Sequence, residues 1–161
     1  MNYPTLFFCL LISLAAFSQT VTSQTDIRSA RFGMSAAEVK ATESQKPSAE
    51  KDGQLTYTNV SLDQEHGDLY YLFEENQLVG ATYHFLSPSP SKQAYVDRYN
   101  KLKAYLTEQY GKPSTDNTNP STKEGPVDHH SAIWRAAGKM VMVLEDNEKG
   151  KAMITVLFSK N

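Results

Sequence analysis

The residues best suited to metal chemistry are Asp128, His129 and His130, three neighbours at the end of a polar stretch. Adjacent imidazoles with a carboxylate can contribute ligands to a zinc or copper ion. Three adjacent side chains rarely complete a coordination shell, so His66 and His84 would have to approach from elsewhere in the chain. His129 and His130 are therefore weak metal-ligand candidates, and we expect no metal and no other cofactor.

Nucleophilic catalysis has little support in the sequence. No serine stands between the glycines of a nucleophile elbow, which exposes the attacking hydroxyl in many hydrolases. Carboxylates gather in turn-like segments such as 63–65 and 74–75, where solvation alone accounts for them. We lean towards a protein that is not an enzyme. The alternative is a small exported hydrolase or metal-dependent enzyme that uses His84, His129 or His130.

The charge balance excludes some classes of partner. The chain has 16 Lys and Arg against 18 Asp and Glu, which gives a formal net charge of −2. Without a basic field there is nothing to attract nucleic acid or an anionic lipid surface. We therefore expect no nucleic-acid partner.

The amino terminus predicts export. Residues 6–17 are an uncharged apolar run that is too short to span a bilayer, and small residues at Ala16 and Ser18 are typical of a signal-peptidase site. Residues 1–18 are predicted to be a signal peptide, with cleavage after Ser23 as the other option. Cleavage removes Cys9, the single cysteine, so the mature protein is expected to have no disulfide and no membrane anchor. We expect a bacterial protein, periplasmic or secreted.

The first part of the mature chain predicts a helix followed by strands. Residues 19–31 are polar and non-periodic, so they are expected to be a flexible lead-in to one domain over 32–161. Ser35 and Glu38 form a capping box, which predicts a helix over 36–44. Alternating segments predict strands over 54–60, 68–74 and 77–86, the last two joined by a turn at Glu75 and Asn76.

The second part predicts a similar succession. A helix begins at Ser89 and Pro90 and buries side chains spaced by three and four residues, namely Tyr95, Tyr99, Leu102, Leu106 and Tyr110. Gly111 ends this helix. A mobile loop is expected over 112–130, and strands over 131–136, 139–145 and 151–158. The predicted fold is α+β: two tandem halves, each a helix plus three antiparallel strands, with the helices packed on one face of an antiparallel sheet.

Two segments resemble a known group of exported bacterial domains. Phe32 to Val39, with its Gly-Met-Ser helix start, and the hairpin from Phe73 to Val79 are similar to the SmpA/OmlA and beta-lactamase-inhibitor-protein type. Tyr110 to Pro113 is similar to the Leu-Gly-x-Pro that ends their repeat helices. The resemblance implies a non-enzymatic binding module whose open sheet face contacts another protein, and no functional residue is carried over from it.

The hairpin itself suggests where such a partner would bind. With a two-residue turn at 75–76, Leu72 pairs with Val79 and both faces of the hairpin are apolar. Helices can cover one face only, so the other is expected to be an exposed aromatic surface. The alternative is a sheet that curls or a loop that covers this face. The predicted partner-binding residues are Leu69, Tyr71, Phe73, Thr82 and His84, and the expected partner is another exported or envelope protein.

Overall fold

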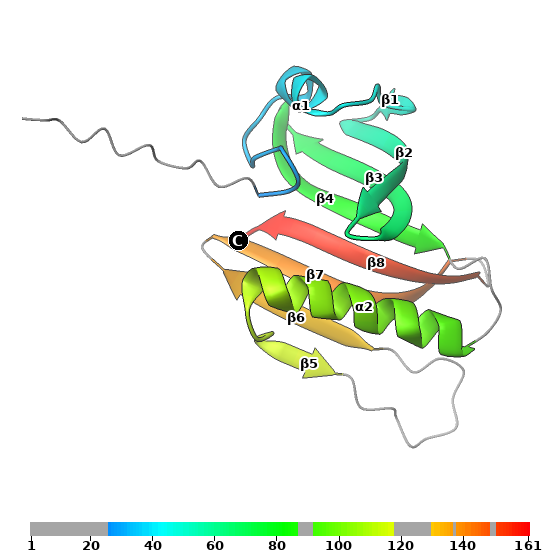
Figure 1. The fold of residues 1–161 in the computed structure, drawn as a ribbon. Coiled ribbons are helices and arrows are strands. Elements are labelled where there is room, and N and C mark those ends of the chain that lie inside the picture. The colour runs from blue at the N-terminus through cyan, green and yellow to red at the C-terminus, as the bar shows by residue number, and fades with distance from the viewer. Residues whose placement is uncertain (1–25, 87–91, 118–129, 137, 149–150) are drawn as a thin grey trace, which may run out of the picture.

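The structure is a computed structural model that describes residues 26–86, 92–117, 130–136, 138–148 and 151–161. In this part of the chain eight antiparallel strands form one sheet in the order β1-β2-β3-β4-β8-β7-β6-β5 (Figure 1). The elements are α1 (Ala36–Thr42), β1 (Ala49–Lys51), β2 (Gln54–Leu62), β3 (Glu65–Glu74), β4 (Gln77–Leu86), α2 (Lys92–Tyr110), β5 (Thr115–Asn117), β6 (Ser131–Ala136), β7 (Lys139–Glu148) and β8 (Lys151–Lys160). The last strand of the chain therefore lies in the middle of the sheet, between β4 and β7.

The predicted architecture of two tandem halves, each a helix plus three strands, is wrong. The described residues form one continuous sheet, because β4 pairs directly with β8 from Gly80 to Leu86. The strands that the prediction lacks, β1 and β5, have three exposed residues each, so they show no apolar alternation in the sequence. The helices are not packed together on the sheet either. α2 lies along β6, β7 and β8, whereas α1 has seven residues and buries only Val39.

The start of α1 is as predicted. The Glu38 amide donates to the hydroxyl of Ser35 over 3.3 Å, and the Ser35 amide donates to the Glu38 carboxylate over 2.8 Å. The pKa of Glu38 is lowered, because the Ser35 amide, and then its hydroxyl, bind the ionised form. The helix ends at Thr42, two residues before the predicted end at Ser44.

α2 buries the predicted face against the sheet. The side chains of Tyr95, Tyr99, Leu102 and Leu106 are all buried, and Tyr110 is half-buried. The helix is followed by Gly111, which has a φ of 77°. This left-handed conformation is one that glycine adopts without strain. The indole Nε1 of Trp134 donates to the carbonyl of Gly111 over 2.8 Å, which ties the end of α2 to β6. The predicted start at Ser89 and Pro90 lies outside the described residues.

The sheet has two distinct faces, which we call inner and outer. The inner face lies against α2 (Figure 1) and holds the hydrophobic core. Its strand residues alternate with those of the outer face and include Leu55, Tyr57, Leu69, Tyr71, Ala81, Tyr83, Phe85, Trp134, Val141, Val143, Val156 and Phe158. This face accounts for the largest buried side chains, so packing here must supply most of the hydrophobic stabilisation.

Part of the predicted lead-in is ordered. Residues 26–30 form a tight turn closed by a bridge between Ile27 and Ala30, and both of these side chains are buried in the core. These two side chains attach the end of the predicted lead-in to the core. The predicted signal peptide, residues 19–25 and loop residues 118–129 lie outside the described residues. Residues 115–117 of the predicted loop form β5.

Within the described residues neither helix is long and apolar enough to cross a membrane.

Candidate functional site

The five residues predicted to contact a partner lie on both faces of the sheet. Leu69 and Tyr71 are fully buried on the inner face, and Phe73 packs against the same core. Thr82 and His84 are half-buried on the outer face. The structure therefore does not bring these five side chains together into one surface.

A β-bulge is the reason. The turn at Glu75 and Asn76 is as predicted, with left-handed φ angles of 48° and 59°. Beyond it, the extra residue Val79 shifts the pairing by one, so that Leu72 lies opposite Gly80 instead of opposite Val79. Because side chains alternate along a strand, this shift exchanges the faces of all β4 residues that follow. The predicted face assignment is wrong for that reason.

The outer face carries a row of side chains that crosses the middle of the sheet. The register places these residues side by side from β3 to β6, in the order Tyr70, Thr82, Leu157, Met142 and Ile133. All five are half-buried, which means that each still presents part of its surface. The row is apolar apart from the threonine and the tyrosine hydroxyl.

The rows on either side extend this surface. One runs from Leu72 to Met140, with Gly80 and Ser159 between them. The other runs from His84 to Leu144, with the buried Thr155 between them. Leu72 is 36 % exposed, and the ring of His84 lies 4.8 Å from that of Tyr70. Between β3 and β6, these three rows contain two charged side chains. Asp68 lies at the β3 end of the surface, and Arg135 lies at its β6 end. We call this surface, with Leu72, Tyr70, Thr82, His84, Leu157, Met140, Met142, Leu144 and Ile133, the outer apolar patch.

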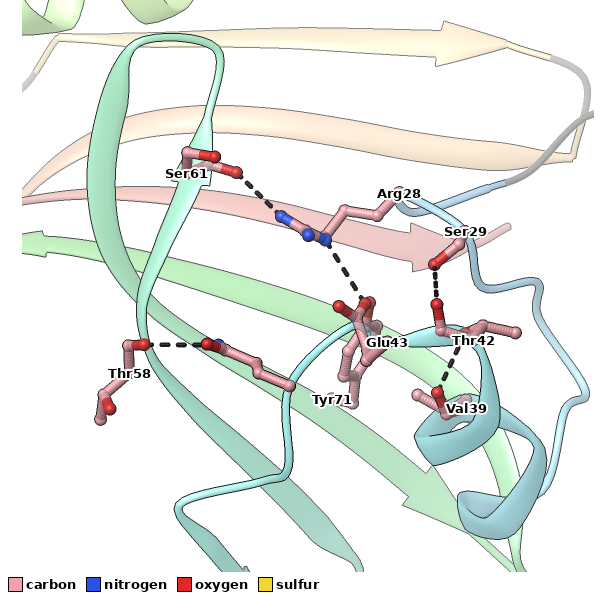
Figure 2. A network of polar contacts seen from close by, with 9 residues as sticks. Arg28, Ser29, Val39, Thr42, Glu43, Thr58, Ser61 and Tyr71 are labelled. Atoms are coloured by element: carbon pink, nitrogen blue, oxygen red, sulfur yellow. Dashed lines mark hydrogen bonds and ion pairs between the residues drawn. The ribbon is translucent and has the colours of Figure 1, made fainter.

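On the inner face, a polar network joins the turn at 26–30 to α1 and β2 (Figure 2). The guanidinium of Arg28 donates from Nη1 to the carbonyl of Ser61 over 2.9 Å, and its Nε lies 3.3 Å from the carboxylate of Glu43. The hydroxyl of Tyr71 donates to the same carboxylate over 2.5 Å. The Glu43 side chain is 1 % exposed, so the network is buried at its centre.

The surroundings shift the pKa of two members of this network, Arg28 and Tyr71. Burial lowers the pKa of Arg28, but Tyr83 and Glu43 next to the guanidinium raise it more, so the net shift is upward. The pKa of Tyr71 is raised well above 10, first by burial and then by its hydrogen bond to Glu43. Arg28 therefore stays charged and Tyr71 stays neutral at physiological pH.

The weak metal candidates do not converge. His130 Nδ1 lies 2.9 Å from Oε1 of Glu145, and the His130 ring packs against Tyr99 on the inner face. His84 lies on the outer face, so the sheet separates it from His130. His129 lies outside the described residues. Among the described residues, no group of three His, Cys, Asp or Glu side chains is placed to hold a metal ion.

The prediction missed the C-terminal share of the outer apolar patch. The segment 140–144 is continuously apolar, a pattern typical of a strand that packs on both faces. That signal alone could have placed Met140, Met142 and Leu144 opposite the core residues Val141 and Val143. No signal in the sequence indicated the network of Arg28 and Glu43, because it depends on long-range contacts.

No known family matches this chain, and no curated protein or solved structure is significantly similar to it.

Proposed function

We propose that this chain is an exported, non-enzymatic binding module that contacts another protein through the outer apolar patch. The observation that carries the proposal is the central row of this patch, in which half-buried side chains from β3 to β6, apolar or aromatic except for Thr82, stand side by side. Contiguous apolar surface on a folded domain is typical of an interaction site.

The composition of the patch indicates a protein partner. The centres of protein interfaces are enriched in tyrosine and methionine and depleted of charge, and the patch holds Tyr70, Met140 and Met142 with charges only at its ends. Methionine side chains adapt to irregular surfaces. The partner we expect is an exported or envelope protein that presents an apolar surface of low charge.

The alternative function, a small exported hydrolase or metal-dependent enzyme, has less support. Among the described residues, the one candidate histidine on the inner face is His130. Its Nδ1 lies 2.9 Å from Oε1 of Glu145. His84 belongs to the outer apolar patch and packs against Tyr70. The resemblance to the SmpA/OmlA and beta-lactamase-inhibitor-protein type remains a prediction, and the proposal does not depend on it.

Affinity capture with charge variants tests the binding role. The immobilised mature protein is exposed to periplasmic extract and culture medium of the source organism, beside the variants Met142→Glu in the patch and Ala104→Glu on the exposed side of α2. We expect the wild type and Ala104→Glu to retain the same protein and Met142→Glu to lose it. Retention that is equal in all three, or absent in all three, would contradict the proposal. Circular dichroism confirms that each variant is folded.

The export part of the proposal has its own test. Mass spectrometry of the protein recovered outside the cytoplasm should give a chain that begins at Gln19 or Gln24. A chain that retains Met1 to Ser18, or one found only in the cytoplasm, would contradict export without bearing on the binding surface.

A further inference from the structure

The outer apolar patch is uneven, because its strands carry side chains of different size. In the three rows, the two middle strands β4 and β8 contribute mostly small outer residues, namely Gly80, Thr82, Thr155 and Ser159. We call these four residues the low strip. Leu157 is the large apolar side chain in its middle, and the ring of His84 packs against that of Tyr70 at 4.8 Å. Gly80 and Thr155 are buried, so the surface is lowest there.

The strands on either side of the low strip carry larger outer side chains, which we call the two ridges. β3 contributes Leu72 and Tyr70, and β7 contributes Met140, Met142 and Leu144. β3 and β7 are three strand spacings apart (Figure 1). At about 4.8 Å per spacing, the ridges are about 14 Å apart. An α-helix with its side chains is about 10–12 Å wide, so one helix fits between the ridges with its axis along the strands.

The strands beneath the patch offer no backbone groups for pairing. Each of the five strands from β3 to β6 already has a neighbour on both sides. A partner segment that binds as an added strand needs an exposed sheet edge. An extended segment lying on the face would bury its own amides and carbonyls without partners, which costs free energy for each group. The occupant must therefore satisfy its own backbone, as a helix or a folded sheet does.

The size of the patch favours a helix over a second sheet. Five strands about 4.8 Å apart and three rows about 6.8 Å apart cover roughly 500 Å². A stable contact between two folded domains, including two copies of this chain, buries about 800 Å² on each partner. The three rows span about 20 Å, which is the length of about 13 helical residues. One helix therefore matches the patch in length and width, whereas a sheet face of the usual interface size extends beyond it.

We propose that the outer apolar patch binds one amphipathic α-helix of the partner protein, which lies along β4 and β8 between the two ridges. The inference rests on the proposed binding role of this patch and adds the kind of element that is bound. Both described helices contribute to the inner core, α1 through Val39 and α2 through its buried face, so neither occupies this position. The bound face of the partner helix is uncharged, because Asp68 and Arg135 lie at opposite ends of the patch.

The probe is a synthetic peptide of about 14 residues, held helical by a covalent staple. Its apolar face has leucines at both ends, above the lowest points of the strip, and alanine in the middle, above Leu157. NMR titration of the labelled mature protein should show saturable binding, with shifts at the outer residues of β4 and β8. A stapled peptide of the same composition with leucines all round, and a strand-forming peptide of alternating leucine and threonine, should each bind at least about tenfold more weakly.

Two phenylalanine variants separate helix binding from general apolar attraction. Ser159→Phe fills the low strip, so it should weaken binding of the helix about tenfold or more, although it adds apolar area. Ile133→Phe is the matched control, because Ile133 lies on β6 beyond the β7 ridge, and it should change the affinity by less than about twofold. General apolar attraction would strengthen binding in both. Circular dichroism confirms folding, and Thr82→Phe, which fills the same strip from β4, replaces Ser159→Phe if that variant does not fold.

The proposal is overturned if the stapled helix shows no saturable binding, if either control peptide binds as well, or if filling the low strip leaves the affinity unchanged. Sedimentation of the mature protein alone should give a monomer. A dimer that Met142→Glu disrupts would mean that a second copy occupies the patch, which also overturns the proposal.

Affinity capture distinguishes failure of this inference from failure of the proposed function. A protein that is retained by Ser159→Phe as well as by the wild type, and is lost with Met142→Glu, would support the binding role and contradict the helix. Binding of the stapled helix as expected, with no protein retained from the extract, would support the helix inference and contradict the binding role.

Discussion

Raising the pH above 10 should destabilise this domain through its buried tyrosines. The pKa values of Tyr71, Tyr83 and Tyr99 are all raised above 10, with burial as the largest cause in each case. None of these side chains is exposed. A raised pKa means that the folded protein keeps these protons while the unfolded chain releases them. The stabilisation is therefore complete below pH 10 and is lost as the pH rises towards the folded pKa values.

The size of the effect follows from the number of tyrosines. At pH 11, one unit above the unfolded pKa, each tyrosine that stays protonated in the folded state costs about 1.4 kcal/mol of unfolding free energy. The three together cost about 4 kcal/mol, which is a large fraction of the total of roughly 5–15 kcal/mol that a small domain has.

Urea unfolding followed by the fluorescence of the buried Trp134, repeated from pH 8 to pH 11, measures this loss. The variant Tyr83→Phe conserves the packing and should lose about 1.4 kcal/mol less by pH 11, since it lacks one tyrosine whose pKa is raised. Tyrosinate absorbance of the folded protein provides the second measurement. An unfolding free energy that stays constant to pH 11, or ionisation of all tyrosines of the folded protein near pH 10, would contradict this prediction.

Three further predictions concern stability, and urea unfolding at neutral pH checks each of them. Gly67→Ala should cost about 2 kcal/mol through overpacking. The added Cβ would lie 2.4 Å from the carbonyl oxygen of His84 in the paired strand. An unchanged unfolding free energy would mean that the two strands can move apart without cost. Glu43→Gln should cost about 2 kcal/mol through the loss of a buried anionic partner. Tyr71 and Arg28 both bind that carboxylate. The exposed pair of Lys40 and Glu50 provides the control. Here Glu50→Gln should cost about 0.5 kcal/mol or less, as exposed ion pairs do. Ser35→Ala should cost about 1 kcal/mol through loss of the helix cap. A variant as stable as the wild type would contradict this prediction.

The elements that sequence predicts well are those set by local chemistry. The capping box at Ser35, the glycine at 111 and the turn at 75–76 each depend on a few neighbouring residues, and all three are confirmed. The strands β4, β6, β7 and β8 also lie where alternation places them, within a few residues at their ends. Their burial provides the signal, since apolar residues recur at every second position or, in 140–144 of β7, at every position.

The features that sequence missed depend on partners distant along the chain. β1 and β5 are exposed on both faces, so they have no apolar period and form only because β2 and β6 offer free edges. The bulge at Val79 is one extra residue in a ladder, and no residue type demands it there. That single residue moved His84 away from Tyr71, which shows why a binding face is harder to predict than a strand.

The short edges of the sheet have a consequence for how the protein behaves at high concentration. A sheet grows from molecule to molecule when a long, flat edge strand offers its unpaired amides and carbonyls to another chain. Here both edges have three exposed residues with a charge in each, Glu50 and Lys51 on β1 and Asp116 on β5, and Pro47 and Pro113 stand just before them. Among the described strands, these short, charged edges disfavour fibre-like polymerisation through the edges, so we expect self-association in crowded solution to proceed by stacking of faces.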